Sequence, residues 1–441
     1  ASVHTALSER QSRVLRRQHL SQADSCLGLS RSSPGRIRGL CSRGAMLARG
    51  ASKMRGSRIR ELLDRAWKLE AQGRTVVHLG VGQPNFASPP CAVEAARSAL
   101  GDRAAQGYVA NAGIASLRDA VATQVYGKRS PAAALTADNI VVTTGSMLAF
   151  YTTFASVLDP GDEVLLPNPG YENYALATEL LGAKAVYYAL IPPTSENPTW
   201  GAPSRAQLDA LATPRTKLVV VCTPSNPTGC VFSKEELQTF VDLARDLPKC
   251  LLLSDEIYGG IYYCGKSAPS VFDCDVGDGS RVAAVSGVSK EFAMTGFRVG
   301  WLATKSAELL QCATKLQEPL VSCGVPFAQA GAEAALRSPN AHAYAAEMRD
   351  AYRSRRDAAV NVLRNFGAYE YTPDGAFYLL VGTRGRDSMD FARHLLEKRG
   401  VAVAPGCAFG TAADHYVRVS LAAHEDDIHR GLTALCEELA R

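Results

Sequence analysis

Short apolar runs alternate with amphipathic helical patterns through the middle of this chain. Five such runs follow one another, and helical spacing of apolar residues comes after the first three. Strands buried on both faces of a parallel sheet are continuously apolar, and parallel neighbours need helical crossovers. The alternation therefore predicts an α/β fold, with a mostly parallel sheet covered by helices on both faces. The runs occupy residues 139–145, 162–170, 217–222, 249–256 and 281–287, and the helical patterns occupy residues 147–158, 172–182 and 233–247.

The segments on either side of this region have a different pattern. Helical spacing begins the folded part at residues 58–73, and a long charged helical pattern at residues 341–366 precedes short strand patterns near the end. A chain of 441 residues is long enough for more than one domain. We expect a large domain over residues 95–323 and a smaller α+β domain built from residues 58–94 and 324–441.

Residues 1–57 form a basic leader rich in Ser and Arg. Residues 1–60 carry a net charge of +11 while the whole chain carries +5, so the remaining residues carry −6. A basic, acid-poor leader on an acidic body is typical of a transit peptide for a plastid or mitochondrion, and the alternative is a disordered tail on a cytoplasmic protein. No aromatic residue lies between the arginines, which disfavours a nucleic-acid partner. No apolar run approaches the ~20 residues of a membrane-spanning helix, so no membrane partner is expected.

Cysteine and histidine spacing predicts no metal site. The twelve cysteines include no CxxC pair, and the eight histidines form no HExxH pattern. We therefore expect reduced cysteines that serve as core residues. A dinucleotide-dependent oxidoreductase is disfavoured as well, because Gly80, Val81 and Gly82 are followed by Gln83 and Pro84, and the third glycine of the dinucleotide fingerprint is missing.

Polar residues follow the ends of the predicted strands. In an open α/β sheet, ligands bind beyond the carboxyl ends of the strands. At these ends the chain places a small-residue turn at 143–147, the string PSNPTG at 224–229, an acid and a phenol in 255–258, and a lysine and an arginine in 286–298. Free N–H groups at a helix start favour an anion such as phosphate. A phosphate site, a carboxylate, an amide, a phenol and a lysine are the groups that pyridoxal 5'-phosphate needs.

Nine motifs then follow one another along the chain: LGVGQPNF, YVANAGIASLRDAV, TTGS, PNPGYENY, PSNPTG, SDEIY, SKEFAMTGFRVGW, PDGAFYLL and HYVRVSLA. With them the chain resembles the class I/II aminotransferases of the aspartate aminotransferase superfamily, which are fold-type I pyridoxal-phosphate enzymes. The resemblance extends from about residue 58 to the C-terminus. It implies a transaminase of amino-acid metabolism and biosynthesis that exchanges an amino group between an α-amino acid and a 2-oxo acid by a ping-pong mechanism. It also implies a homodimer with shared active sites.

The resemblance assigns catalytic roles to individual residues. Lys290 is the lysine that forms the Schiff base with the cofactor and then acts as the base that moves the α-proton. Asp255 pairs with the pyridine nitrogen and keeps the ring cationic. Asn226 and Tyr258 donate hydrogen bonds to the phenolic oxygen of the cofactor. Tyr171 stacks on the pyridine face.

The resemblance also places the phosphate and the substrate. Gly82 and Arg418 bind the substrate α-carboxylate together with Asn226, and arginine suits this role because its guanidinium makes two-pronged contacts. Tyr108 reaches the phosphate of the partner subunit. The remaining phosphate ligands that the resemblance implies are Gly145, Ser146, Met147, Ser289 and Arg298.

Two features leave alternatives open. Many relatives carry a serine where this chain has Gly287, and Ser286, one position earlier, is the candidate to replace its hydroxyl. The segment at residues 315–329, which lines the side-chain pocket in relatives, offers no arginine, so neutral, aromatic and acidic substrates are all admissible. The alternative activities on this fold are a C–S β-lyase and an aminocyclopropane-carboxylate synthase, since the same cofactor stabilises carbanions with several fates.

Overall fold

A computed structural model describes residues 54–194, 196–369 and 371–441. The predicted leader lies outside the described residues except for its last four positions. Within the described ranges, no helix is both long and apolar enough to cross a membrane.

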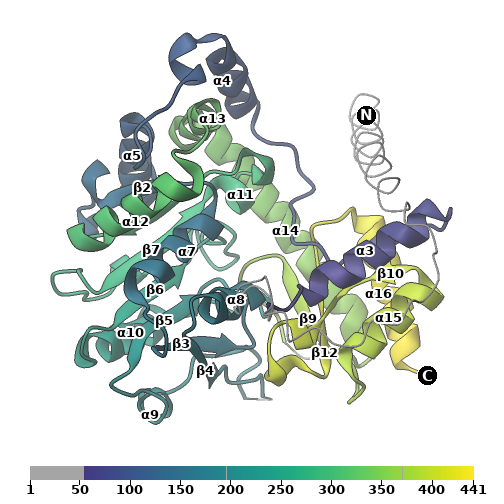
Figure 1. Cartoon of the computed structure of the whole chain (residues 1–441). Helices are drawn as coiled ribbons and strands as arrows, with labels where there is room; N and C mark the ends of the chain where they lie inside the picture. The colour runs from purple at the N-terminus through teal and green to yellow at the C-terminus, as the bar shows by residue number, and fades with distance from the viewer. Residues whose placement is uncertain (1–53, 195, 370) are drawn as a thin grey trace, which may run out of the picture. The chain divides into compact units, whose positions relative to one another are not determined.

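A seven-stranded sheet forms the centre of the larger part of the chain (Figure 1), with strand order β2-β8-β7-β6-β5-β3-β4. The pairs from β7 to β4 are parallel, whereas β8 runs antiparallel to both β2 and β7. The prediction of a mostly parallel sheet is therefore confirmed. The strands are β2 (Ile140–Thr143), β3 (Glu163–Asn168), β4 (Lys184–Ala189), β5 (Thr216–Cys222), β6 (Leu251–Asp255), β7 (Val282–Gly287) and β8 (Gly300–Thr304).

Helices cover both faces of this sheet, and the side chains of β5 show why. Val219 and Val221 belong to one hydrophobic core, and Leu218 and Val220 belong to the other. Helices α5, α10 and α13 contribute to the first core, and α7, α8 and α12 to the second. The helices of this region are α4 (Pro90–Gly101), α5 (Ala115–Ala120), α6 (Gly127–Arg129), α7 (Ser146–Val157), α8 (Glu172–Leu180), α9 (Arg205–Asp209), α10 (Lys234–Asp246), α11 (Val288–Glu291), α12 (Ala307–Val321) and α13 (Pro326–Arg337).

A smaller α+β unit joins the two ends of the described chain. Strand β1 (Val77–His78) pairs in parallel with β10 (Val401–Ala402), which brings the N-terminal segment against the C-terminal one. The unit also holds an antiparallel sheet of order β11-β12-β9. Its other elements are α3 (Arg58–Ala71), α14 (Pro339–Asn365), β9 (Tyr378–Gly382), α15 (Ser388–Arg399), β11 (Ala404–Pro405), β12 (Tyr416–Ser420) and α16 (Glu425–Leu439). This architecture confirms the predicted fold class.

The limits predicted for the two domains stay predictions. Helix α4 lies across the limit at residues 94 and 95, and α13 begins two residues after the limit at 323 and 324. These two helices pack closely on each other.

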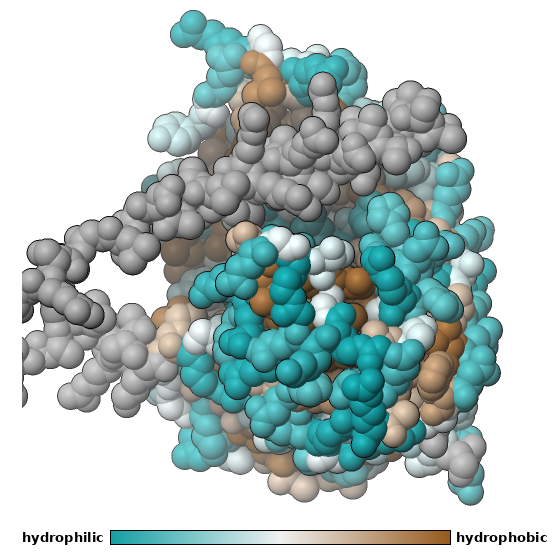
Figure 2. All heavy atoms as spheres, turned by 90° about the vertical axis from the view of Figure 1, so that its right-hand side faces the viewer, coloured by the Kyte–Doolittle hydropathy of each residue, from teal (hydrophilic) through white to brown (hydrophobic). Residues whose placement is uncertain are grey.

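Figure 2 shows a mostly hydrophilic face over α3, α15 and α16. Ion pairs tie these three helices together: Arg393 to Glu61 at 2.6 Å, Arg65 to Glu397, and Arg399 to Glu437. Each of these contacts is at the surface, where a single pair stabilises by only ~0.2–1 kcal/mol. The buried Leu62 and Ala66 pack α3 into the core, and the ion pairs add to this, so that the start of α3 lies beside the site described below.

Candidate active site

A cavity lies beyond the carboxyl ends of β5, β6 and β7. Its volume of about 380 Å³ falls within the ~300–1,000 Å³ typical of small-molecule sites. Residues of β9, β12 and α3 from the smaller unit complete its wall. The structure brings most of the predicted site residues together here: Gly82, Ser146, Met147, Tyr171, Asn226, Asp255, Tyr258, Ser289, Lys290, Arg298 and Arg418.

Lys290 presents its amine to this cavity from α11, directly after β7. Its Nζ donates a hydrogen bond to the Gly82 carbonyl at 2.6 Å. Burial and the positive charges of Arg418 and Arg298 lower the pKa of Lys290 to about 8, against a smaller opposing effect of Asp255. A lysine with a lowered pKa has more of the neutral amine that attacks a carbonyl group.

Asp255 ends β6 with its carboxylate buried in the wall of the cavity. Oδ2 accepts a hydrogen bond from the Tyr174 hydroxyl, and Oδ1 accepts one from the Ile257 N–H at 3.1 Å. Burial raises the pKa of Asp255 to about 6, although both hydrogen bonds lower it. The charged carboxylate is therefore stabilised by any cation placed against it, such as a protonated ring nitrogen.

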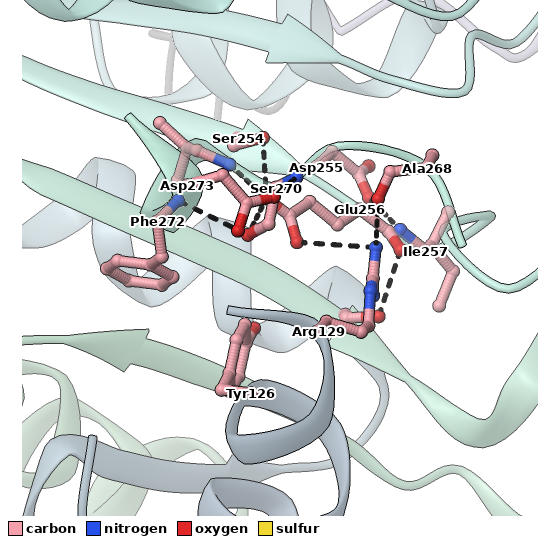
Figure 3. A network of polar contacts seen from close by, with 12 residues as sticks. Tyr126, Arg129, Ser254, Asp255, Glu256, Ile257, Ala268, Ser270, Phe272 and Asp273 are labelled. Carbon is pink, nitrogen blue, oxygen red and sulfur yellow. Dashed lines mark hydrogen bonds and ion pairs between the residues drawn. The ribbon is translucent and has the colours of Figure 1, made fainter. Parts of the chain in front are cut away.

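Glu256 lies behind Asp255 in a polar network that also contains Arg129 (Figure 3). Oε1 of Glu256 accepts hydrogen bonds from Ser270 Oγ and the Val271 N–H, both at 2.9 Å, and from Ser254 Oγ at 3.2 Å. Oε2 has no hydrogen-bond partner and lies 3.9 Å from Arg129 Nη2. Burial raises the pKa of Glu256, and Arg129 lowers it. The arrangement fixes the chain on the C-terminal side of Asp255.

An anion cradle occurs at the start of α7. Gly145 occupies the N-cap position with φ of +76°, and α7 has no side-chain cap there. A Cβ atom at Gly145 would lie closer to Arg298 Nη2 than van der Waals contact allows, and the left-handed backbone at this position also favours glycine. Arg298 is held by a hydrogen bond from Nη1 to the Thr295 carbonyl at 3.1 Å. The helix N-terminus and the guanidinium together favour a phosphate group.

Arg418 is almost completely buried, with 3% of its surface exposed. Nη1 donates to Asn226 Oδ1 at 2.8 Å, and Nη2 donates to the Gly80 carbonyl at 2.7 Å. Nε is buried without a hydrogen-bond partner. A buried guanidinium with an unused donor is suited to bind a carboxylate.

Two tyrosine hydroxyls meet beside these groups. The Tyr258 hydroxyl lies 2.8 Å from the Tyr378 hydroxyl, and both side chains line the cavity. Since Asn226 uses its oxygen to accept from Arg418, its side chain offers N–H donors to a ligand. Tyr258 and Asn226 thus form a donor pair on one wall.

A model of the family described as aminotransferase class I and II matches residues 74–435 of this chain. The chain belongs to this family. It is accordingly a transaminase, and its fold is that of aspartate aminotransferase.

Individual relatives of this aminotransferase support the assignment. The aspartate aminotransferase of Pyrococcus horikoshii is 35% identical over 376 residues, which cover 84% of this chain and 92% of the relative. Aromatic-amino-acid aminotransferase 2 of Thermococcus litoralis is 35% identical over 370 residues, covering 83% of this chain and 91% of the relative. Among solved structures, aspartate aminotransferase from Thermus thermophilus with maleate has a TM-score of 0.81 at 32% identity and covers 91% of this chain and 100% of its own.

The class I and II aminotransferases depend on pyridoxal 5'-phosphate, and three observations fit this group to the cavity. The start of α7 and Arg298 form an anion cradle that would hold the phosphate. Burial raises the pKa of the Asp255 carboxyl, and a cationic ring nitrogen against it would favour its charged form. The amine of Lys290 lies in the same cavity, with a lowered pKa.

Tyr108 does not line the cavity of this aminotransferase chain. It is 89% exposed, the largest fraction among the exposed large hydrophobic residues of the described chain. Its predicted role is to reach a partner subunit, and this role stays a prediction.

Gly287 has a steric reason to be glycine. It pairs with Gly300 across β7 and β8, and a Cβ at this position would lie 2.7 Å from the Val299 carbonyl oxygen. Ser286 donates its hydroxyl to the Glu256 carbonyl at 3.1 Å and does not line the cavity. Ser286 therefore does not replace the hydroxyl that Gly287 lacks.

Several residues of the cavity were not predicted from the sequence. Tyr174 and Tyr378 stand inside quoted motifs, yet only their contacts with Asp255 and Tyr258 reveal them. Tyr174 follows Tyr171 by three positions in a helical pattern, and this spacing places both side chains on one face. The spacing could have indicated that Tyr174 also lies at the site. The wall formed by α3 has no comparable signal, and its residues are Ser57, Ile59, Arg60 and Leu63.

Proposed function

We propose that this aminotransferase moves the amino group of a free α-amino acid to a 2-oxo acid by a ping-pong mechanism, with pyridoxal 5'-phosphate bound through Lys290. The observation that carries the proposal is the meeting of the Lys290 amine, the Asp255 carboxylate and the Arg418 guanidinium in one cavity. When bound, the cofactor supplies a ring that takes up the electron pair left by the departing α-proton.

The protein residues would divide the work around that ring. Asp255 would hold the ring nitrogen, and its charge would keep that nitrogen protonated. Asn226 and Tyr258 would donate to the ring oxygen, and the cradle of α7 and Arg298 would bind the phosphate. Lys290, as a neutral amine, would take the α-proton of the substrate and return it during the exchange.

Arg418 would select substrates that carry an α-carboxylate. Nη1 and Nη2 each use one N–H, on Asn226 and on Gly80, so the second N–H of each would be left for a carboxylate. An amine without a carboxylate would leave these donors unsatisfied, at a cost of ~1–3 kcal/mol. A free amino acid is therefore the expected donor.

The side-chain subsite would be formed in part by α3. Ile59 and Leu63 offer apolar surface, and Arg60 offers a cation. In the described part of this chain, residues 315–329 contribute nothing to the cavity wall. The relatives named above are called aspartate and aromatic-amino-acid aminotransferases. Aspartate and an aromatic amino acid are therefore the first donors to test.

Steady-state kinetics test the proposal directly. Donor and acceptor concentrations are varied together, and both products are quantified. Double-reciprocal plots with parallel lines and equal amounts of both products are expected. The Arg418→Lys variant should raise the KM for the donor by about 10- to 100-fold, because lysine cannot make the two-pronged contact.

The same assay separates transfer from the lyase alternative. An amino acid with a β-leaving group is incubated without an acceptor. Release of pyruvate and ammonia at a rate comparable to transfer would contradict the proposed transaminase function. The relatives reported above are all named for amino-group transfer, which favours transfer over elimination.

We further propose that the enzyme works as a homodimer with shared active sites. Exposed large hydrophobic side chains occur on α4 at Val93 and Leu100, and also at Leu320, Val321 and Val325. Exposed apolar side chains of this size favour burial against another protein surface. Tyr108 belongs to the same set of exposed residues, and the partner's cavity is its proposed destination.

A further inference from the structure

The guanidinium of Arg418 lies over two aromatic rings that no motif assigned to the site. Its Cζ is 4.3 Å from the centre of the Tyr378 ring and 4.9 Å from the centre of the Phe409 ring. Tyr378 begins β9, the strand that pairs with the strand of Arg418, and Phe409 follows β11. Both rings are buried, with 1% and 2% of their surfaces exposed.

These contacts compensate for the burial of a charge. An arginine removed from water needs hydrogen bonds or other electrostatic partners. Arg418 donates hydrogen bonds to Asn226 and Gly80, and no carboxylate of the described residues forms an ion pair with it. The faces of the two rings supply further attraction to the cation. They also restrict the plane of the guanidinium.

Tyr378 has a second contact at its other end. Its hydroxyl lies 2.8 Å from the hydroxyl of Tyr258. Burial raises the pKa of both tyrosines, so both keep their protons at neutral pH. If Tyr378 donates to the Tyr258 oxygen, the Tyr258 proton stays available for a further acceptor. A hydrogen bond received in this way strengthens Tyr258 as a donor.

We propose that Tyr378 is a positioning residue with two separable roles. Its ring, together with that of Phe409, orients Arg418 toward the substrate carboxylate. Its hydroxyl orients and polarises the hydroxyl of Tyr258 toward the ring oxygen of the cofactor. The inference rests on the proposed function, because it uses the roles given there to Arg418 and Tyr258.

The two roles are tested by two variants of the cofactor-loaded enzyme. Tyr378→Phe keeps the ring and removes the hydroxyl, whereas Phe409→Leu removes one ring and leaves the hydroxyl pair intact. Two quantities are measured: the KM for the amino donor, and the pH midpoint at which the visible absorbance of the bound cofactor changes. The Kd of an α-methyl amino acid, which has no α-proton to lose, reports carboxylate binding without turnover.

The expected results differ between the variants. Tyr378→Phe should raise the absorbance midpoint by about half a pH unit or more, because a weaker Tyr258 donor leaves more negative charge on the ring oxygen. Its donor KM should stay within about twofold of the wild type, since its ring still contacts Arg418. Phe409→Leu should raise the KM and the Kd by about fivefold and leave the midpoint unchanged.

Matched controls lie elsewhere in the fold. Tyr188→Phe removes an equally buried hydroxyl that donates to the Val220 carbonyl at 2.8 Å. Phe391→Leu removes a buried ring that lies 4.8 Å from the Arg386 guanidinium. Neither residue lines the cavity. Both controls should leave the midpoint, the KM and the Kd at wild-type values.

Two outcomes would overturn the inference. One is a Tyr378→Phe enzyme whose midpoint equals that of Tyr188→Phe, and the other is a Phe409→Leu enzyme with wild-type KM and Kd. If Phe409→Leu does not fold, Tyr378→Leu is compared with Tyr378→Phe. Both variants lack the hydroxyl, and only Tyr378→Leu lacks the ring. An equal donor KM for these two variants rejects the orienting role of the Tyr378 ring. A wild-type enzyme that fails to transfer amino groups would instead reject the proposed function itself.

Discussion

At Lys290, the lowered pKa has a measurable consequence for the cofactor-free protein. An ordinary lysine is an ammonium ion until pH 10.4 or so. Lys290, with a pKa of about 8, is an ammonium ion below that pH and a neutral amine above it. We expect the rate of acylation of Lys290 by an amine-selective reagent to reach half its maximum near pH 8. Mass spectrometry of the labelled peptide measures this rate.

The Lys290→Ala variant supplies the background from the other lysines in this experiment. A half-maximum above pH 10 for the Lys290 peptide would contradict the electrostatic account. The lowered pKa also affects stability. Between pH 8 and 10.5, Lys290 is more protonated in the unfolded chain than in the folded one. The free energy of unfolding should therefore gain a contribution from Lys290 as the pH rises through that interval.

Gly287 gives a second prediction at the level of one residue. Gly287→Ser would force a side chain against the Val299 carbonyl. Overpacking of this kind costs ~1–3 kcal/mol, so urea denaturation should show a less stable protein. Ser286→Ala should cost ~1 kcal/mol of unfolding free energy and leave the donor KM unchanged, since its hydroxyl bonds only the Glu256 carbonyl. A Gly287→Ser protein of wild-type stability and higher activity would show that the missing hydroxyl matters.

Site residues that directly follow a predicted strand could be predicted from the sequence. Lys290, Asp255 and Asn226 follow apolar runs, and the fold carries all three to one cavity. Tyr378 and Phe409 could not be predicted in this way, because their side chains contact Arg418 from another strand and from a loop. Such contacts depend on register and on the path of a loop, which local patterns do not encode.

Among the elements, the end of β6 depends on the ion pair of Glu256 and Arg129. The Glu256 side chain is fully buried, and Arg129 reaches it from α6. Removing one partner of a buried pair leaves an uncompensated charge, which costs ~3–5 kcal/mol. We expect Arg129→Met to lower the free energy of unfolding by about 3 kcal/mol. Chemical denaturation of the purified protein measures the loss.

A double-mutant cycle separates the pair from the packing around it. The variant with both Arg129→Met and Glu256→Gln should lose less unfolding free energy than the two single variants lose together, because no unpaired charge is then buried. Additive losses would mean that Arg129 acts through its hydrogen bond to the Ala268 carbonyl instead.

Two strands show the limit of pattern reading at this scale. Strand β4 pairs only with β3 at the sheet edge and is mostly half-buried or exposed, so it lacks a continuous apolar run. Strand β8 is fully buried but follows immediately after the segment that carries Lys290 and Arg298. Strand β8 runs antiparallel beside β7, and a pattern of strands alternating with helices does not predict such a pairing.

For the whole molecule, the proposed shared sites predict complementation between two defective chains. A Lys290→Ala chain lacks the amine, and a Tyr108→Ala chain lacks the side chain proposed to reach its partner. In a mixed dimer, one site contains both changes and the other contains neither. Co-expression of the two variants should therefore give activity that neither variant shows alone. Mixed dimers without recovered activity would place Tyr108 and Lys290 in the same subunit's site.

Half of the reaction can be followed through the absorbance of the bound cofactor. Purified protein loaded with pyridoxal 5'-phosphate is mixed with one amino acid and no acceptor, and the visible absorbance is recorded. We expect complete conversion to the pyridoxamine form, reversal on addition of a 2-oxo acid, and conversion that is about 10²–10⁴-fold slower in Lys290→Ala. An absorbance that no amino acid changes, or conversion at wild-type rate without Lys290, would contradict the proposed function.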